Sequence, residues 1–322
     1  MSVARLAGQP RYDRLRLVVG EGNSDISATI KDSLFSRGIR QVVTCSGTDR
    51  LFEALDAEIV DLLLYDYDLL GNDFIEVMQR IRRKARGKNP FVIIVATVKD
   101  SAVETVRRLI SAGVDDLIRK PVSVDRLFES LGNFSHKRKP FVVAYDYVGP
   151  TRRLGRRTDE PAGQLIRVPN TLRSRAIEGV SDLDLQRMVD NAVASLDDKQ
   201  LESCGIEIDL LSKRVAENYG AANNTHEDEQ DVRGALHRIE VVADDLRQRA
   251  AGTSTERIAD LATMLVAVSQ RILRAPGGRA VLEVQLLTKL AAAIRRALLV
   301  ERNSVMVMQE IAQTVANYTS RH

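Results

Sequence analysis

Short apolar runs alternate with amphipathic segments over roughly the first 135 residues of the chain. The apolar runs lie at 14–19, 41–45, 61–66, 91–97 and 115–120 and have the length and composition of strands. The segments at 24–37, 48–57, 71–86, 100–112 and 124–134 between and after them have the pattern of helices. Such alternation with short connections predicts an α/β fold, in which a doubly wound five-stranded parallel sheet is covered by helices on both faces.

Polar residues stand where four of these predicted strands end. Glu21 follows the first strand by one glycine, Asp66 ends the third, Thr97 ends the fourth, and Lys120 ends the fifth, directly before Pro121. Because parallel strands end at one edge of the sheet, these side chains are expected to converge. One carboxylate can accept a phosphoryl group, a second can share a divalent cation, and a hydroxyl and an ammonium can hold phosphoryl oxygens. A lone strand-end Asp is more often a helix cap, but four such groups together favour a phosphoryl-transfer site.

These stretches resemble the receiver domain of two-component response regulators, of the chemotaxis-regulator type. The resemblance covers about residues 14–134 and rests on LVVGEGN at 17–23, DLLLYD at 61–66, FVIIVAT at 91–97 and AGVDDLIRKP at 112–121. It implies a flavodoxin-like fold in which Asp66 accepts phosphate from a histidine kinase or a phosphotransfer protein. It also implies a Mg²⁺ ion held by Glu21, Asp66 and the backbone carbonyl of Asp68.

The resemblance assigns further roles near the ends of the fourth and fifth strands. Thr97 is the implied switch hydroxyl, and Lys120 is the implied lysine ahead of a cis peptide bond to Pro121, which is an uncommon bond. Leu117 stands where the family has its aromatic switch residue. Phosphorylation is therefore expected to signal differently in this chain.

The first strand departs from the family pattern. Receivers usually place two acids after this strand, whereas here Gly20 takes the first position and only Glu21 remains. A cage with fewer charges is expected to bind Mg²⁺ more weakly. A receiver-like scaffold that takes no phosphate is the alternative. The phosphoacceptor role is favoured for Asp66 because Lys120 is retained, whereas a ligand and a solvent-exposed acid are equally supported for Glu21.

Residues 136–180 read as a basic connector arm. The stretch 137–175 holds ten basic and three acidic residues, and its prolines and glycines exclude long regular elements. The segment FVVAYDYV at 141–148 is expected to add an edge strand or to lie along the receiver. One interpretation of the charge is a patch for nucleic acid or an acidic membrane. We favour an ordered arm whose arginines pair with acids of its own receiver or of a partner subunit.

From 181 to 322 the pattern is helical. Leu185, Val189 and Leu196 keep helical spacing, and comparable stripes recur to the end of the chain, whereas the polar stretch 219–230 predicts a loop. Several long amphipathic helices predict an all-α helical bundle, which often buries its stripes in a homodimer. The segment around His237 resembles phosphotransfer helices, but a surface or interface histidine is the favoured interpretation.

Composition narrows the function further. The chain has 322 residues, a net charge of +3, 4% aromatic residues, and two distant cysteines, Cys45 and Cys204. These features fit a two-domain protein of the reducing cytoplasm, with no disulfide framework and no stacking platform for single-stranded nucleic acid. No apolar run approaches the roughly 20 residues of a membrane helix. We find no Gly-rich phosphate loop or metal-binding histidine pair in the second half, so no enzyme activity is expected beyond the receiver's own phosphoryl transfer and dephosphorylation.

The sequence therefore predicts a response regulator with four parts. These are an N-terminal tail at 1–13, a receiver at 14–135, the connector arm at 136–180 and a helical output region at 181–322 that serves dimerisation and protein contacts. Two alternatives stay open, namely a phosphate-independent scaffold and a DNA-binding regulator that uses the arm and the helices.

Overall fold

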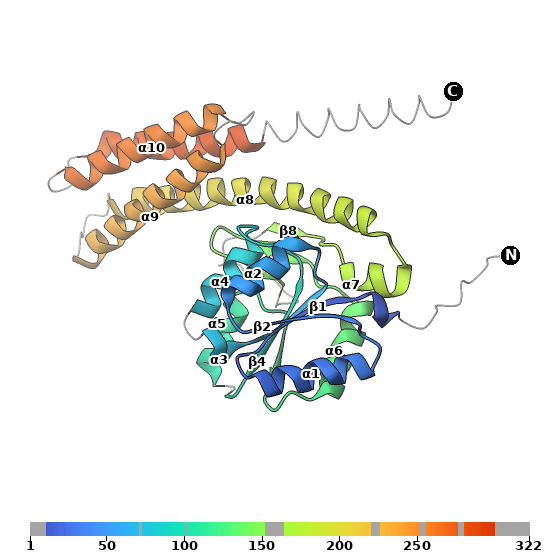
Figure 1. Cartoon of the computed structure of the whole chain (residues 1–322). Helices are drawn as coiled ribbons and strands as arrows, with labels where there is room; N and C mark the ends of the chain where they lie inside the picture. Colours follow the sequence, from blue (N-terminus) through green and yellow to red (C-terminus); the bar gives the residue numbers. More distant parts are fainter. Residues whose placement is uncertain are drawn as a thin grey trace, which may run out of the picture. The chain divides into compact units, whose positions relative to one another are not determined.

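The computed structural model describes residues 11–70, 73–100, 102–151, 164–219, 226–250, 256–275 and 280–299. These residues divide into two compact units. The first holds the described residues up to 151 together with 164–196, and the second holds those from 197 to 299. Figure 1 shows the strands gathered in the first unit, while helices alone make up the second.

The first unit is built on a parallel sheet of five strands in the order β2-β1-β3-β4-β5. This sheet confirms the predicted doubly wound α/β fold. The strands are β1 (Arg16–Gly20), β2 (Gln41–Cys45), β3 (Leu62–Asp66), β4 (Ile93–Val98) and β5 (Asp116–Arg119). Every residue of β3 and β4 is buried, as expected for central strands that are covered on both faces.

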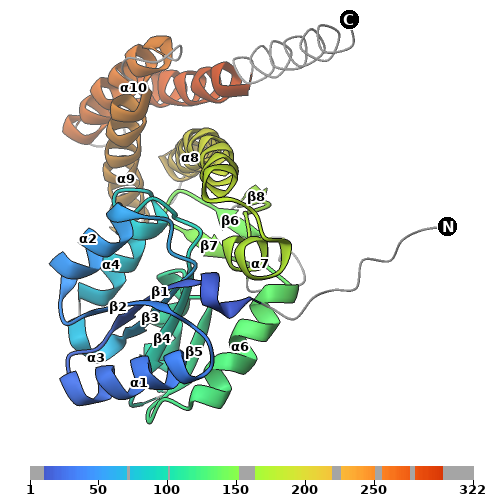
Figure 2. The same cartoon turned by 45° about the vertical axis from the view of Figure 1, so that its right-hand side comes forward.

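Helices cover both faces of this sheet (Figure 2). On one face, α1 (Ser24–Ser36) and α6 (Val124–His136) bury Leu34 and Leu127 against the strands. On the other face, α2 (Thr48–Ala57), α4 (Asp73–Arg82) and α5 (Val103–Ser111) bury Phe52, Phe74 and Leu109. The short η1 (Tyr12–Arg14) precedes β1, and the short α3 (Tyr67–Leu70) follows β3. Because the helices cover both faces of the sheet, polar groups can gather only at the ends of its strands.

The connector arm folds into a second, antiparallel sheet in the order β7-β6-β8. Its strands are β6 (Phe141–Val143), β7 (Val148–Pro150) and β8 (Gln164–Ile166), so the segment at 141–148 adds no edge strand to the main sheet. Phe141 and Val143 share a buried cluster with Ile59 and Phe91, which precede β3 and β4. The arm then continues through α7 (Thr171–Arg173) and η2 (Ser174–Glu178).

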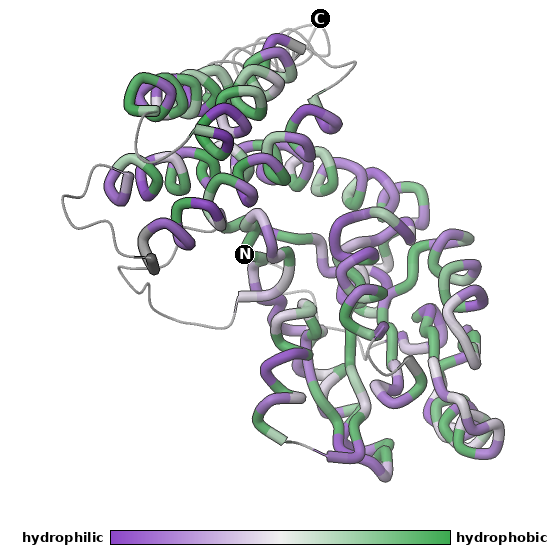
Figure 3. Tube along the Cα trace, turned by 90° about the vertical axis from the view of Figure 1, so that its left-hand side faces the viewer, coloured by the Kyte–Doolittle hydropathy of each residue, from purple (hydrophilic) through white to green (hydrophobic). Residues whose placement is uncertain are grey.

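The long helix α8 (Asp182–Tyr219) contributes its residues up to Leu196 to the first unit and the rest to the second. The second unit continues with α9 (His226–Ala250), α10 (Glu256–Arg274) and a helical segment at 281–299. It is all-helical, as predicted, and the helices of both units carry hydrophobic and hydrophilic residues side by side along the chain (Figure 3). No helix in the described ranges is long and apolar enough to cross a membrane.

One prediction in this region was wrong. The last five residues of the predicted loop 219–230, from His226 to Gln230, form the start of α9. Three of them are the acids Glu227, Asp228 and Glu229. Acidic side chains interact favourably with the positive end of the helix dipole, so their polarity is compatible with a helix start.

Candidate functional site

Glu21, Asp66 and Lys120 meet at the edge of the main sheet where its strands end. The Lys120 Nζ lies 2.7 Å from Asp66 Oδ2 and 3.1 Å from Glu21 Oε2. Asp66 is 5% exposed and Glu21 is 6% exposed. One ammonium group therefore bridges two nearly buried carboxylates, one directly after β1 and one at the end of β3.

The parallel register of the sheet brings this set together. Asp66 and Thr97 are direct partners between β3 and β4, and Thr97 is buried. Lys120 continues the line of β5, because its backbone N–H donates to the carbonyl of Val98 at 2.8 Å. The Lys120–Pro121 peptide bond is cis, as the resemblance implies. Four strand ends that lie far apart in the sequence thus contribute to one region.

Backbone amides orient the two carboxylates. The N–H of Asn23 donates to Glu21 Oε1 at 3.1 Å, and the N–H of Asp68 donates to Asp66 Oδ1 at 3.2 Å. Each carboxylate consequently holds one oxygen against the backbone and offers the other to Lys120. Burial disfavours the charge on Lys120, but hydrogen bonds and attraction from Asp66 and Glu21 outweigh it and raise the pKa of this ammonium above its usual range. Lys120 is therefore a fixed positive charge at neutral pH.

The donor set is compatible with Mg²⁺. The described residues contain no group of three or more His, Cys, Asp or Glu side chains placed to hold a metal. Mg²⁺ in proteins is commonly bound by one or two carboxylates, with water and substrate phosphate completing its octahedron. Glu21 and Asp66 supply two carboxylates, and Asp68, in the short helix α3, has a backbone carbonyl next to them in the chain. The side chain of Asp68 instead lies 3.5 Å from Lys99 Nζ.

Leu117 lies on β5 beside Ala96 of β4 and packs, partly buried, against the core cluster that includes Tyr65 and Phe74. His237 lies in the second unit on α9. It is well exposed, and its Nδ1 lies 3.4 Å from Glu240 Oε2. This contact fits a surface histidine paired with a carboxylate.

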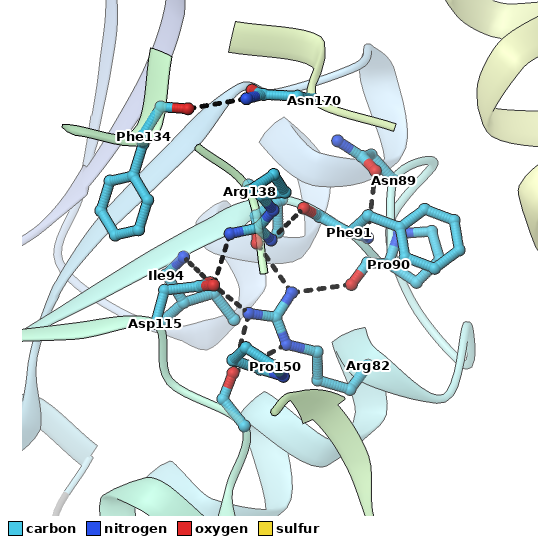
Figure 4. A network of polar contacts seen from close by, with 12 residues as sticks. Arg82, Asn89, Pro90, Phe91, Ile94, Asp115, Phe134, Arg138, Pro150 and Asn170 are labelled. Carbon is cyan, nitrogen blue, oxygen red and sulfur yellow. Dashed lines mark hydrogen bonds and ion pairs between the residues drawn. The ribbon is translucent and has the colours of Figure 1, made fainter. Parts of the chain in front are cut away.

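A buried polar network at the opposite end of the strands was not anticipated from the sequence. The guanidinium of Arg82, which is 1% exposed, donates to the carbonyls of Pro90, Val92 and Gly113 at 2.7 to 2.9 Å. It also pairs with Asp115 at 2.7 Å (Figure 4). Burial lowers the pKa of Arg82 to about 10, although Asp115 opposes the shift, so this side chain keeps its charge at neutral pH.

Arginines of the connector arm pair with acids of the receiver. Arg138 binds Asp115 and donates to the carbonyl of Phe91 at 2.9 Å (Figure 4). Arg175 Nε lies 2.9 Å from Asp61 Oδ2, directly before β3. For Arg138 and Arg175, the predicted pairing of arm arginines with receiver acids is confirmed. Arg152, Arg153, Arg156 and Arg157 lie outside the described residues. Asp61 lies directly before β3 and Asp115 directly before β5, where polar residues are ordinary, so no local pattern identified either pair.

The family comparison concerns the first unit. Residues 17–132 match the family of the response regulator receiver domain. A cyclic di-GMP phosphodiesterase of Thermotoga maritima is 35% identical over 71 residues, which are 22% of this chain and 18% of that protein. The transcriptional regulatory protein TctD of Salmonella typhimurium is 25% identical over 115 residues, which are 35% of this chain and 48% of that protein. The chain thus spans less than half the length of both curated relatives.

Three similar solved structures each cover 37% of this chain. A chemotaxis protein of Vibrio cholerae is 15% identical with a TM-score of 0.34, and it covers 37% of this chain and 97% of its own. A response regulator from Thermotoga maritima is 21% identical with a TM-score of 0.33. The match covers 37% of this chain and 95% of that one. A third structure is the receiver domain of a sensor histidine kinase from Pseudomonas aeruginosa, with magnesium coordinated in its active site cleft. It is 22% identical with a TM-score of 0.33, and the match covers 37% of this chain and 95% of that one.

Proposed function

Residues 17–132 form a response regulator receiver domain, and we propose that this domain accepts a phosphoryl group on Asp66 from a histidine kinase or a phosphotransfer protein. The match to the receiver family supports a two-component response regulator. The proposal adds the residue that is modified, the donor and the part that carries the output.

The observation that carries the proposal is the ammonium shared by two carboxylates. Asp66 holds one oxygen on the N–H of Asp68 and the other on Lys120. A carboxylate oxygen that is held in place and nearly buried is a suitable nucleophile, because its orientation costs little at the moment of attack. Lys120 can then shift its contact from the carboxylate of Asp66 to the oxygens of the transferred phosphoryl group.

In the proposed transfer, a carboxylate oxygen of Asp66 attacks the phosphorus of a phosphohistidine on the donor. A phosphorus–oxygen bond forms, the phosphorus–nitrogen bond breaks, and the imidazole leaves as the neutral ring after taking a proton. Lys120 binds a phosphoryl oxygen, and the hydroxyl of Thr97, beside Asp66 in the register, binds another. Water reverses the modification by attacking the acyl phosphate, which releases inorganic phosphate and regenerates the carboxylate.

Glu21, Asp66 and the backbone carbonyl of Asp68 are the groups that would hold Mg²⁺. When bound, this ion neutralises the negative charge that gathers on the phosphoryl oxygens. Glu21 is oriented for this role by the N–H of Asn23, which donates to one of its oxygens. Leu117, at the switch position, packs on the core beside Ala96. The proposed response to phosphorylation is therefore a change in the packing of this aliphatic side chain.

We further propose that the helical second unit is a non-catalytic output region for dimerisation and protein contacts. Its helical segment at 281–299 exposes Val281, Leu282 and Leu286. The pairing of Arg138 and Arg175 with acids of the receiver supports a structural role for these two arm arginines over binding of nucleic acid phosphates.

The test is phosphorylation of the full chain with a small phosphodonor and Mg²⁺, read as acid-labile phosphate. We expect wild type to be labelled and Asp66→Asn to lose the label, because the amide is not a nucleophile toward phosphorus. Asp73→Asn is the matched control, since it makes the same change at an exposed position in the first turn of α4.

Two results would contradict the proposal. Absence of label on wild type at every Mg²⁺ concentration would favour a phosphate-independent scaffold. Equal labelling of wild type and Asp66→Asn would place the phosphate elsewhere, and Glu21→Ala tests separately whether the label depends on the acid that directly follows β1. A shift of random duplex DNA that weakens steeply with salt would instead favour the DNA-binding alternative.

A further inference from the structure

Tyr65 occupies the space that a side chain at position 20 would need. Gly20 and Tyr65 are direct partners between β1 and β3, one residue before Glu21 and Asp66 in each chain segment. A Cβ atom added to Gly20 would lie 2.0 Å from Tyr65 Cδ2, 2.1 Å from Cε2 and 2.9 Å from Cγ. These distances are far below van der Waals contact, so the ring covers the α-carbon of Gly20.

The ring has little freedom to move aside. Tyr65 is 0% exposed and belongs to the core cluster between the sheet and α2, α4 and α5. Its ring centroid lies 6.1 Å from that of Phe74, and Cys45, the β2 partner of Gly20, is buried in the same cluster. A packed core yields to an added methyl group only at a cost in strain.

The hydroxyl of Tyr65 is not the reason for the residue's presence. It is a buried polar atom that makes no hydrogen bond within the described part of the chain. A buried hydroxyl without a partner lowers stability, so the ring itself is the useful part of the side chain. In this packing the ring of Tyr65 fills the space over the α-carbon of Gly20.

We propose that Gly20 and Tyr65 form a matched pair in which the tyrosine ring excludes any side chain from position 20, the last residue of β1, and so leaves Glu21 as the single acid at positions 20 and 21. Tyr65 is thus the residue that determines the charge of the site, and Gly20 is its permissive partner. The inference rests on the proposed magnesium site at Glu21 and Asp66.

The pair has a functional consequence. Mg²⁺ affinity depends on the number of charged ligands, so a site with two carboxylates binds the ion more weakly than a site with three. A second acid cannot be introduced at position 20 by one substitution, because its Cβ would collide with the ring. A second acid therefore needs substitutions at both positions 20 and 65. With only two carboxylates, the affinity for Mg²⁺ stays low enough for phosphorylation to depend on the concentration of Mg²⁺.

The first part of the experiment is a double-mutant cycle on the full chain without metal. Thermal unfolding followed by circular dichroism compares wild type, Gly20→Ala, Tyr65→Ala and the double variant. We expect Gly20→Ala alone to lower the unfolding temperature and to cost much less in the Tyr65→Ala background. Gly132→Ala on α6 is the matched control, because no atom lies within 4 Å of its added Cβ.

The second part measures Mg²⁺ binding by calorimetry with the metal alone. Gly20→Asp in the Tyr65→Ala background adds a carboxylate beside Glu21, and we expect roughly tenfold tighter binding than in Tyr65→Ala. Tyr65→Val provides a second background, since valine suits a strand better than alanine if the larger cavity weakens the fold.

The outcomes separate this inference from the proposed function. If Gly20→Ala is as stable as Gly132→Ala, the ring does not exclude a side chain and the matched pair is wrong. If the added Asp leaves Mg²⁺ binding unchanged in both backgrounds, position 20 does not set the charge of the site. If wild type and Asp66→Asn bind Mg²⁺ equally, the proposed metal site fails, whatever the cycle gives.

Discussion

Asp61 lies immediately before β3, and its side chain is completely buried. Burial raises the pKa of Asp61 to about 6, although Arg175 and the backbone N–H of Arg16 oppose the shift. A carboxyl whose pKa is higher in the folded state takes up a proton on folding. Its contribution to stability is therefore present below its ordinary pKa of 3.8 and is lost as the pH rises through about 6.

We predict that wild type becomes less stable relative to Asp61→Asn as the pH rises from 4 to 8. Between these two pH values the pKa shift corresponds to a change of about 2.4 kcal/mol in the difference between the two free energies of unfolding. Urea unfolding at the two pH values measures it. Asp190→Asn, an exposed position on α8, is the control and should show little of this dependence. A difference that is constant with pH would contradict the shift.

The sequence predicted the residues at one end of the strands and missed those at the other. Glu21, Asp66, Thr97 and Lys120 stand out because a buried apolar run is followed by a polar residue that has no structural need to be there. Asp61 lies before its strand, where polar residues are ordinary. Arg82 lies in the last turn of α4, and basic residues are common in the last turn of a helix. Only the assembled fold brings Arg82 to Asp115, so no local pattern could identify the pair.

At the scale of elements, Arg82 joins the end of α4 to the segments before β4 and β5. Its guanidinium donates to backbone carbonyls at Pro90, Val92 and Gly113 and pairs with Asp115. We predict that Arg82→Met destabilises the receiver by roughly 3–5 kcal/mol, because it leaves a buried carboxylate and several carbonyls without this donor. Chemical unfolding measures the loss.

The same substitution at an exposed site is the control for Arg82. Arg107→Met lies on the exposed face of α5 and is expected to change the free energy of unfolding by less than about 0.5 kcal/mol. A loss for Arg82→Met no larger than that for Arg107→Met would show that the network contributes nothing to the stability of these elements.

Helix and strand types were predictable here because their apolar periods differ. The five strands and the five main helices of the receiver lie within a few residues of the predicted ranges. The small sheet of the arm was missed, since three-residue strands such as β6 are too short to show alternation. Its antiparallel pairing depends on contacts between Phe141 and the receiver residues Ile59 and Phe91, which the local sequence does not reveal.

At the scale of the whole molecule, the first unit extends well beyond the matched family region. Ile59 and Phe91 of the receiver share their buried cluster with β6, β7 and the residues of α8 from Leu185 to Leu196. A chain that ends after His136 would expose both side chains to water. We predict that it is roughly 3–6 kcal/mol less stable than a chain that ends after Leu196, since each buried large side chain contributes roughly 1.5–3 kcal/mol.

Chemical unfolding of the two shortened chains tests this prediction, and Phe91→Ala in the longer chain is the internal control. Removing the ring should reproduce part of the loss, because Phe91 packs edge-on against Phe141 at 5.7 Å between ring centroids. Equal stability of the two shortened chains would mean that the arm and the start of α8 lie on the receiver without stabilising it.

The exposed apolar residues of the helical segment at 281–299 favour self-association. Leu282 is 77% exposed and Val281 is 55% exposed, and such adjacent apolar groups are stabilised when a second copy covers them. We predict that the mass measured by light scattering rises with concentration toward that of a dimer, and that Leu282→Asp shifts the rise to higher concentration. Val103→Asp, at a receiver residue that is 69% exposed, is the matched control and should leave it unchanged. A strict monomer at high concentration would contradict the dimer, and an equal effect of both variants would move its interface away from this segment.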